Sequence, residues 1–196
     1  MNKPGNAGRT NSIFDADTYV ILPVPPPVAE RIMAIRTEHQ DAFRMALPVE
    51  ITVAGSSGIG TIHHDQDPDE AFRLLDTVAN TTPPIRVSFG PVQRFPGTDI
   101  FVVQPVDPRP FHQLHQRLAT SGIKFNVSPF PYTPHCTLRS RSPVSETEAR
   151  RLMETQITGT VTLTMLQVLR VNRLPPDRRV QLDILHEARF MAKSAQ

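Results

Sequence analysis

Apolar residues recur along the chain with two periods, which together predict an alternation of strands and helices. Short apolar or alternating runs that end at proline, glycine or aspartate are typical of β-strands. These runs lie at residues 19–24, 50–54, 85–95, 99–106, 135–139, 160–171 and 179–185. Apolar residues spaced three or four positions apart predict helices. These stretches lie at about 27–45, 67–79, 107–120 and 145–155.

Local signals support the ends of several of these elements. Asp67 can cap the helix that follows it, with Glu70 three residues further on, and Ser145 begins a second capping box. The Pro-Gly pair at 96–97 predicts a turn between two strands, and Pro-Pro-Asp at 175–177 predicts a hairpin.

The order strand–helix–strand–helix–strand occurs twice, which predicts an internally duplicated α+β fold. We expect a single bilobal domain over residues 18–190, with lobes at about 18–98 and 99–190. Two antiparallel-type sheets would then enclose a central cleft. The polar segment 1–17 is predicted to be a flexible N-terminal tail, and residues 191–196 a C-terminal tail.

The composition fits one large domain and gives no indication of a secreted or membrane protein. The chain has 196 residues, and its single cysteine, Cys136, excludes an internal disulfide. No apolar run is long enough to cross a membrane, and the first 17 residues lack the apolar core of a signal peptide. We therefore expect a cytoplasmic monomer.

The net charge of +2 conceals an asymmetry between the two halves of the chain. Residues 1–108 carry 8 Lys and Arg against 13 Asp and Glu, whereas residues 109–196 carry 13 against 6. Eighteen of the 21 basic residues are arginine, whose planar guanidinium matches a phosphate well. Genomic composition explains the arginine excess equally well, but the asymmetry favours an anionic ligand.

One predicted strand gathers side chains that suit the handling of a phosphate. Alternate residues of a strand share a face, so His135, Thr137 and Arg139 would project together. Cys136 and Leu138 would then be directed into the core. The shared face combines a titratable imidazole, a hydroxyl and a guanidinium.

An earlier strand has the same pattern with one difference. Glu50 and Thr52 share a face, with apolar residues behind them, so a carboxylate stands where an imidazole is expected. If the two equivalent strands lie side by side, they line a groove with Glu50, Thr52, His135 and Thr137.

The segment 130–139, Phe-Pro-Tyr-Thr-Pro-His-Cys-Thr-Leu-Arg, resembles the second signature of the two-histidine phosphoesterase superfamily. That group includes bacterial 2′-5′ RNA ligases and 2′,3′-cyclic phosphodiesterases. The resemblance implies a bilobal, duplicated fold in which each lobe offers one His-x-Thr/Ser motif to the cleft. It also implies acid–base chemistry without a metal or cofactor, on RNA ends or nucleotide 2′,3′-cyclic phosphates. By this resemblance His135 is a catalytic acid or base, and Thr52 and Thr137 hold phosphate oxygens.

The first motif departs from this family pattern, because Glu50 occupies the place of its histidine. Glu50 is predicted to act as a surrogate base, with His135 as the acid, although a carboxylate beside a phosphodiester repels it. Loss of one partner predicts impaired turnover, since general acid–base assistance contributes about 10²–10⁴-fold. The alternative is a binding module for RNA ends or nucleotides that has lost catalysis. Both residues also have an interpretation without a functional role: Glu50 could be an ordinary exposed carboxylate at a strand end, and His135 could be a packed histidine that the backbone satisfies.

Further residues near the second motif are candidates for substrate binding. Arg139 and Arg141 are predicted to contact phosphate, or else to form a solvated rim. Phe130 and Tyr132 are predicted to stack on a base, or else to fill a hydrophobic gap.

The remaining histidines support only a minor alternative. His63 and His64 follow a glycine-rich loop and either replace the missing imidazole or belong to a solvated loop. His112 and His115 lie three residues apart on a predicted helix, where a metal-dependent hydrolase would use them. We expect no metal, because no cysteine or acidic third ligand lies near the helical pair.

Overall fold

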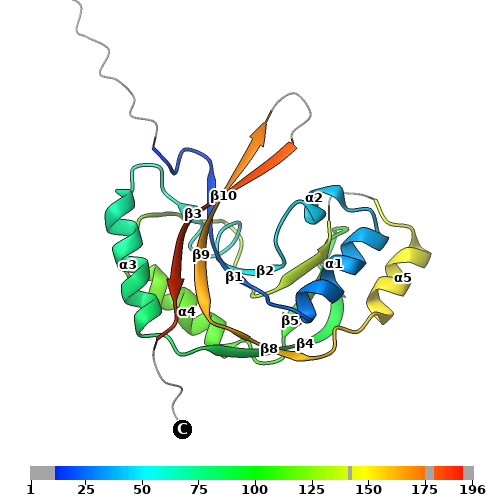
Figure 1. Cartoon of the computed structure of the whole chain (residues 1–196). Helices are drawn as coiled ribbons and strands as arrows, with labels where there is room; N and C mark the ends of the chain where they lie inside the picture. Colours follow the sequence, from blue (N-terminus) through cyan, green and yellow to red (C-terminus); the bar gives the residue numbers. More distant parts are fainter. Residues whose placement is uncertain (1–11, 141–142, 175–178, 192–196) are drawn as a thin grey trace, which may run out of the picture.

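Two antiparallel sheets, with helices packed on their outer sides, make up the computed structural model, which describes residues 12–140, 143–174 and 179–191 (Figure 1). The predicted α+β class and the two antiparallel sheets around a central cleft are confirmed.

The first sheet has the strand order β10-β9-β1-β2, and each neighbouring pair is antiparallel. Its strands are β1 (Asp17–Pro23), β2 (Glu50–Ala54), β9 (Met165–Leu174) and β10 (Arg179–Arg189). Helix α3 (Pro68–Asn80) packs on β9 and β10, and α4 (Arg109–Ala119) contacts α3 and β2. His186 of β10 links the sheet to α3, because its Nε2 lies 2.8 Å from Oδ1 of Asp76.

The second sheet has the order β7-β5-β4-β8 and is also antiparallel. Its strands are β4 (Ile85–Arg94), β5 (Phe101–Pro105), β7 (Cys136–Arg139) and β8 (Thr160–Leu163). Helices α1 (Val28–Glu38) and α2 (Ala42–Met45) contact β7, and α5 (Glu146–Glu154) packs on β4. Two short strands that the sequence did not predict, β3 (Thr61–Ile62) and β6 (Phe125–Asn126), pair with each other.

The predicted helix caps are confirmed. Asp67 Oδ1 accepts a hydrogen bond from the Glu70 amide at 2.8 Å, and Ser145 Oγ accepts one from the Glu148 amide at 3.2 Å. The predicted continuous helix over 27–45 is wrong, because α1 ends at Glu38 and α2 begins separately. Between them Gln40 adopts a positive φ of 50°, which no α-helix accommodates.

The two lobes interleave the two halves of the chain. Strands β1 and β2 share a sheet with β9 and β10, and β4 shares the other sheet with β5, β7 and β8. The expected lobe boundary near residue 98 therefore does not separate the sheets. The edge strands β2 and β7 contact each other, as expected for the two equivalent strands, and one cluster of buried apolar side chains extends through both lobes.

A buried arginine ties the lobes together at this junction. Arg36 of α1 is fully buried and donates through Nε and Nη2 to the Thr137 carbonyl at 3.2 and 2.9 Å. Its Nη1 donates to the carbonyls of Arg44, Leu47 and Pro48 at 2.9, 3.0 and 3.1 Å. One guanidinium thus joins β7 to the segment that leads into β2.

The predicted N-terminal tail is too long. Residues 1–11 lie outside the described residues, but Phe14 is 3% exposed and packs edge-on against Phe72 of α3, with ring centroids 6.1 Å apart. Phe14 thus packs against α3, which covers the first sheet, so the folded part of the chain starts before β1. At the other end, residues 192–196 of the predicted C-terminal tail lie outside the described residues.

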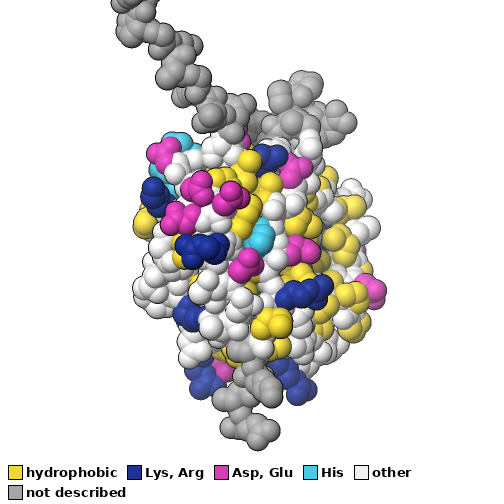
Figure 2. Space-filling view, turned by 60° about the vertical axis from the view of Figure 1, so that its left-hand side comes forward, with side chains coloured by type: hydrophobic (Ala, Val, Ile, Leu, Met, Phe, Trp, Pro, Cys, Tyr) yellow, Lys and Arg dark blue, Asp and Glu magenta, His cyan; other side chains and the backbone are white. Residues whose placement is uncertain are grey.

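The face that carries α3 mixes charges of both signs. Figure 2 turns this side of the molecule forward, and acidic and basic side chains are interspersed on it, with acidic groups most frequent in its upper part. Each lobe contains segments from both halves of the chain, so the acidic first half and the basic second half do not form separate acidic and basic regions on this face. None of the described helices combines the length and apolar character needed to cross a membrane.

Candidate active site

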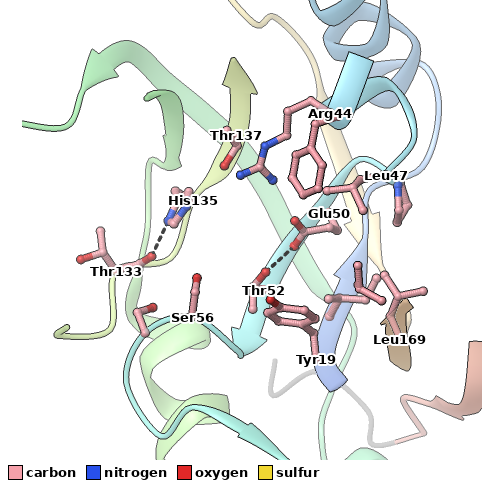
Figure 3. Close-up of a pocket in the computed structure, with 15 residues that line it drawn as sticks. Tyr19, Arg44, Leu47, Glu50, Thr52, Ser56, Thr133, His135, Thr137 and Leu169 are labelled. Carbon is pink, nitrogen blue, oxygen red and sulfur yellow. Dashed lines mark hydrogen bonds between the residues drawn. The ribbon is translucent and has the colours of Figure 1, made fainter. Parts of the chain in front are cut away.

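A cavity of about 810 Å³, including its open mouth, lies where β2 and β7 meet (Figure 3). Apolar residues of β1 and β9 form one wall: Tyr19, Ile21, Leu169 and Val171. Glu50 and Thr52 lie beside this wall on β2, which pairs with β1, and the other polar residues of the lining include Arg44, Ser56, His135 and Thr137. The structure therefore brings four of the predicted site residues together, namely Glu50, Thr52, His135 and Thr137.

His135 immediately precedes β7 and presents one ring nitrogen to the cavity. Its Nδ1 lies 2.7 Å from the Thr133 carbonyl, which can only accept, so Nδ1 carries the proton and donates it (Figure 3). This fixes Nε2 as the nitrogen that can take a proton from a ligand. Burial lowers the pKa of His135, while the bond to Thr133 and the carboxylate of Glu50 oppose that shift. The neutral imidazole is thereby favoured.

The predicted alternation along β7 is observed next to His135. Thr137 lines the cavity, whereas Cys136 and Leu138 are both 0% exposed and lie in the core. Burial raises the pKa of the Cys136 thiol to about 12, so this group is not a nucleophile at neutral pH. Only the imidazole and the hydroxyl of this strand therefore reach the cavity.

Glu50 and Thr52 of β2 lie across the cavity from His135 (Figure 3). Thr52 Oγ1 donates to Glu50 Oε2 at 2.8 Å, so the carboxylate already has one partner within its own strand. Glu50 is 9% exposed and faces the cavity rather than bulk solvent. Glu50 is therefore not an ordinary exposed carboxylate, which was the non-functional alternative for this residue.

Arg44 of α2 is a cavity residue that the sequence did not point to. Its guanidinium extends toward the space between Thr137 and Glu50 (Figure 3). The sequence signal for a separate helix here was Asp41, three residues before Arg44. Asp41 caps α2, because its Oδ1 accepts a hydrogen bond from the Arg44 amide at 3.0 Å. The expectation of one unbroken helix over 27–45 concealed this cap.

Two of the predicted substrate-binding residues have protein partners away from the cavity. Arg139 is 5% exposed, its Nε lies 3.4 Å from Glu148 Oε1, and its Nη2 donates to the Pro143 carbonyl at 3.3 Å. Tyr132 stacks on His115 with ring centroids 3.9 Å apart, and burial raises the pKa of its hydroxyl. Neither residue lines the cavity, so Arg139 and Tyr132 hold the surrounding structure in place.

The other two predicted contact residues differ from each other. Phe130 is 66% exposed on the loop before β7 and does not line the cavity. Arg141 lies outside the described residues.

The remaining histidines lie apart from the cavity. His115 Nδ1 donates to the Val53 carbonyl at 2.7 Å, and His112 meets the Tyr132 ring edge-on, so both belong to the packing behind β2. Among the described residues, the group with metal-ligand spacing is His63, His64 and Asp65, on an exposed loop. Neither His63 nor His64 replaces the missing imidazole in the cavity.

Comparison with known proteins gives a consistent result. A sequence model of the 2′-5′ RNA ligase superfamily matches residues 24–174. No curated protein matches the sequence. Among solved structures, TT0787 of Thermus thermophilus has a TM-score of 0.67 at 15% identity, with 91% of this chain and 100% of that chain covered. E. coli LigT in its apo form has a TM-score of 0.62 at 17% identity over 90% and 98% of the two chains. LigT has also been solved with 3′-AMP and with ATP.

Proposed function

The chain belongs to the 2′-5′ RNA ligase superfamily, and we propose that its cavity hydrolyses 2′,3′-cyclic or 2′-5′ phosphodiesters of nucleotides or RNA ends. The observation that carries this proposal is the convergence of His135, Thr137 and Thr52 on one cavity. Crystal structures of LigT with 3′-AMP and ATP support a nucleotide as the ligand of such a fold. The proposed chemistry uses side chains alone.

In the proposed reaction His135 is the base. Its buried, neutral imidazole presents Nε2 to the cavity, where it takes a proton from the attacking water. The oxygen of that water forms a bond to phosphorus, and the bond between phosphorus and one ribose oxygen breaks. The released ribose oxygen takes a proton from solvent, and His135 gives its extra proton back to solvent. Of the two roles that the sequence left open for His135, this assignment selects the base, because burial disfavours the imidazolium form.

The two threonines would hold the phosphate from opposite strands. Thr137 and Thr52 place hydroxyl groups on the two sides of the cavity, where they would donate to phosphate oxygens as charge develops. Thr52 donates to Glu50 in the free protein, so its hydroxyl must turn toward the phosphate when substrate binds. No second imidazole lines the cavity among the described residues, and turnover should accordingly be slow.

A second candidate function is binding of RNA ends or nucleotides without cleavage. The observation that favours it is the Glu50 carboxylate inside the cavity, where a histidine would otherwise complete the acid–base pair. In this case the protein would bind nucleotides with a salt-dependent affinity and would turn over none of them.

The test is incubation of the purified protein with the four nucleoside 2′,3′-cyclic phosphates, with product release measured beside His135→Ala and His135→Gln. We expect slow turnover by the wild type, with a loss of about 100-fold or more in both variants. The same samples, titrated with 3′-AMP, separate the two functions. Turnover that is equal in wild type and variants would remove the enzyme, and retained 3′-AMP binding would then support the binding module.

A further inference from the structure

We propose that Arg44 binds the non-bridging oxygens of the substrate phosphate, and that Ser140 and Asp41 hold its guanidinium in place. This inference rests on the proposed use of the cavity for a phosphodiester and adds the residue that gives the site its affinity for an anion. Arg44 extends from α2 into the cavity between Thr137 and Glu50 (Figure 3).

A chain of hydrogen bonds through two buried residues, Ser140 and Asp41, holds the Nε side of the Arg44 guanidinium. Arg44 Nε donates to Ser140 Oγ at 2.9 Å, and the Ser140 amide donates to Asp41 Oδ2 at 2.6 Å. The other oxygen of Asp41 accepts the Arg44 amide at 3.0 Å. Asp41 and Ser140 are 3% and 2% exposed, so this chain is fixed by packing as well as by hydrogen bonds.

The other side of the guanidinium is left for a ligand. Within the described part of the chain, neither terminal nitrogen of Arg44 has a hydrogen-bond partner, and no ion pair joins Arg44 to Glu50. The aromatic ring of Phe43 lies against the cation, 5.6 Å from Cζ to its centroid. A fork of two donors that is held at one side and open at the other matches two oxygens of a phosphate.

The charge balance of the cavity requires such a residue. Burial lowers the pKa of Arg44, Glu50 raises it and Arg36 lowers it, yet an arginine stays protonated in proteins. Since His135 is favoured in its neutral form, Arg44 is the permanent cation among the described residues that line the cavity. Without it, the negative charge of Glu50 would repel a phosphate.

The test is the affinity for inorganic phosphate and for 3′-AMP, measured by calorimetry on the full chain. Arg44→Gln should weaken both affinities at least tenfold, and Arg44→Lys should give an intermediate loss because it keeps the charge without the fork. Ser140→Ala keeps the Arg44 cation but removes the hydrogen bond that holds its Nε, and should weaken binding by a smaller factor than Arg44→Gln does. Arg86→Gln on the exposed side of β4 removes the same charge elsewhere and should change nothing.

The outcomes separate this inference from the proposed function. In active protein, Arg44→Gln should raise KM for a cyclic phosphate while the pH dependence that His135 sets stays unchanged. Phosphate binding that depends on Arg44 without any turnover would remove the proposed activity and leave Arg44 as the anion site. Turnover together with unaltered phosphate affinity and KM in Arg44→Gln, or no phosphate binding by the wild type, would overturn the role of Arg44. Far-ultraviolet circular dichroism of each variant verifies its fold.

Discussion

The feature of this chain that matters most at the scale of single residues is the pairing of one imidazole with one carboxylate. His135, just before β7, and Glu50 of β2 face the same cavity. The edge strands β7 and β2 are the ones that the two sheets bring into contact. A histidine at position 50 would place a second imidazole on the opposite side of a bound phosphate. In the proposed reaction, Glu50 therefore stands where a second acid–base group would lie.

Glu50→His is therefore expected to raise kcat toward nucleoside 2′,3′-cyclic phosphates by about 10²-fold, the lower end of the contribution from a general acid. The added imidazole would protonate the leaving ribose oxygen, while His135 remains the base. Glu50→Gln is the matched control, because it removes the negative charge without adding a proton donor, and it should mainly lower KM. If Glu50→His were no faster than Glu50→Gln, the missing imidazole would not be what limits turnover.

The pH dependence of the reaction reports on the role of His135. Burial lowers the pKa of His135, and the base must be neutral to accept a proton. We therefore expect kcat/KM to increase as the pH rises through a value below about 6.5, the ordinary pKa of histidine, and to level off above it. The measurement is a kcat/KM profile from about pH 4.5 to pH 8. A decline with rising pH over this range would instead assign His135 as the acid.

Alternation along a strand predicted four of the residues that line the cavity, but it also predicted Arg139, which is held by Glu148 and the Pro143 carbonyl instead. His135, Thr137, Glu50 and Thr52 were found because the period of two along a strand dictates which side chains share a face. Arg44 reaches the cavity because Ser140, 96 positions further along the chain, anchors its side chain. No local pattern contains such a contact.

At the scale of elements, capping residues placed two helix starts correctly, whereas two continuous elements were predicted wrongly. The predicted strand over 160–171 is two strands, because β8 ends at Leu163 in the second sheet and β9 begins at Met165 in the first. The sequence predicted β2 at its observed bounds and placed the start of α3 and α5 through Asp67 and Ser145. It missed the break between α1 and α2, because the apolar positions continue across Gln40 and glutamine carries no turn signal. The two-residue strands β3 and β6 are too short for any periodicity to reveal.

The loop after β2 and the loop before β7 form a second element-scale link beside the cavity. The Gly58 amide donates to the Phe130 carbonyl at 2.8 Å, and the Ser128 amide donates to the Gly58 carbonyl at 3.1 Å. Gly58 has a φ of 65°, and a Cβ there would overlap the His115 ring and lie 2.9 Å from Tyr132 Cβ. The stacked rings of His115 and Tyr132 therefore require glycine at this position.

We expect Gly58→Ala to lower the free energy of unfolding by about 2 kcal/mol or more, since backbone strain and steric overlap add together. Gly97→Ala provides the control, because Gly97 has a similar φ of 70° and nothing within 4 Å of a built Cβ. That variant should lose only about 1 kcal/mol from strain. Urea unfolding of the two variants beside the wild type gives the comparison, and equal losses would show that the rings behind Gly58 move aside freely.

At the scale of the whole molecule, the two lobes form one cooperative unit. Neither lobe is a continuous stretch of chain, because each sheet combines strands from both halves, and one buried apolar cluster runs through both. The sequence predicted the two sheets and the cleft, but a repeated order of elements cannot tell whether the repeats stay separate or exchange strands. Strand exchange is decided by long-range pairing, of which β1 with β9 is the central case.

The side chain at the centre of this junction is Arg36, and its loss should affect the whole fold. Arg36→Met would leave the carbonyls that Arg36 satisfies, those of residues 44, 47, 48 and 137, without these donors in a buried place. Each unsatisfied buried carbonyl costs about 1–3 kcal/mol, so the free energy of unfolding should decrease by about 3 kcal/mol or more.

Arg31→Met is the matched control, because Arg31 lies exposed on the same helix and should change stability by less than about 0.5 kcal/mol. Urea unfolding followed by both circular dichroism and tyrosine fluorescence measures the loss and should give coincident transitions for the wild type. Similar stability of the two variants would mean that the contact of β2 with β7 does not depend on the buried guanidinium.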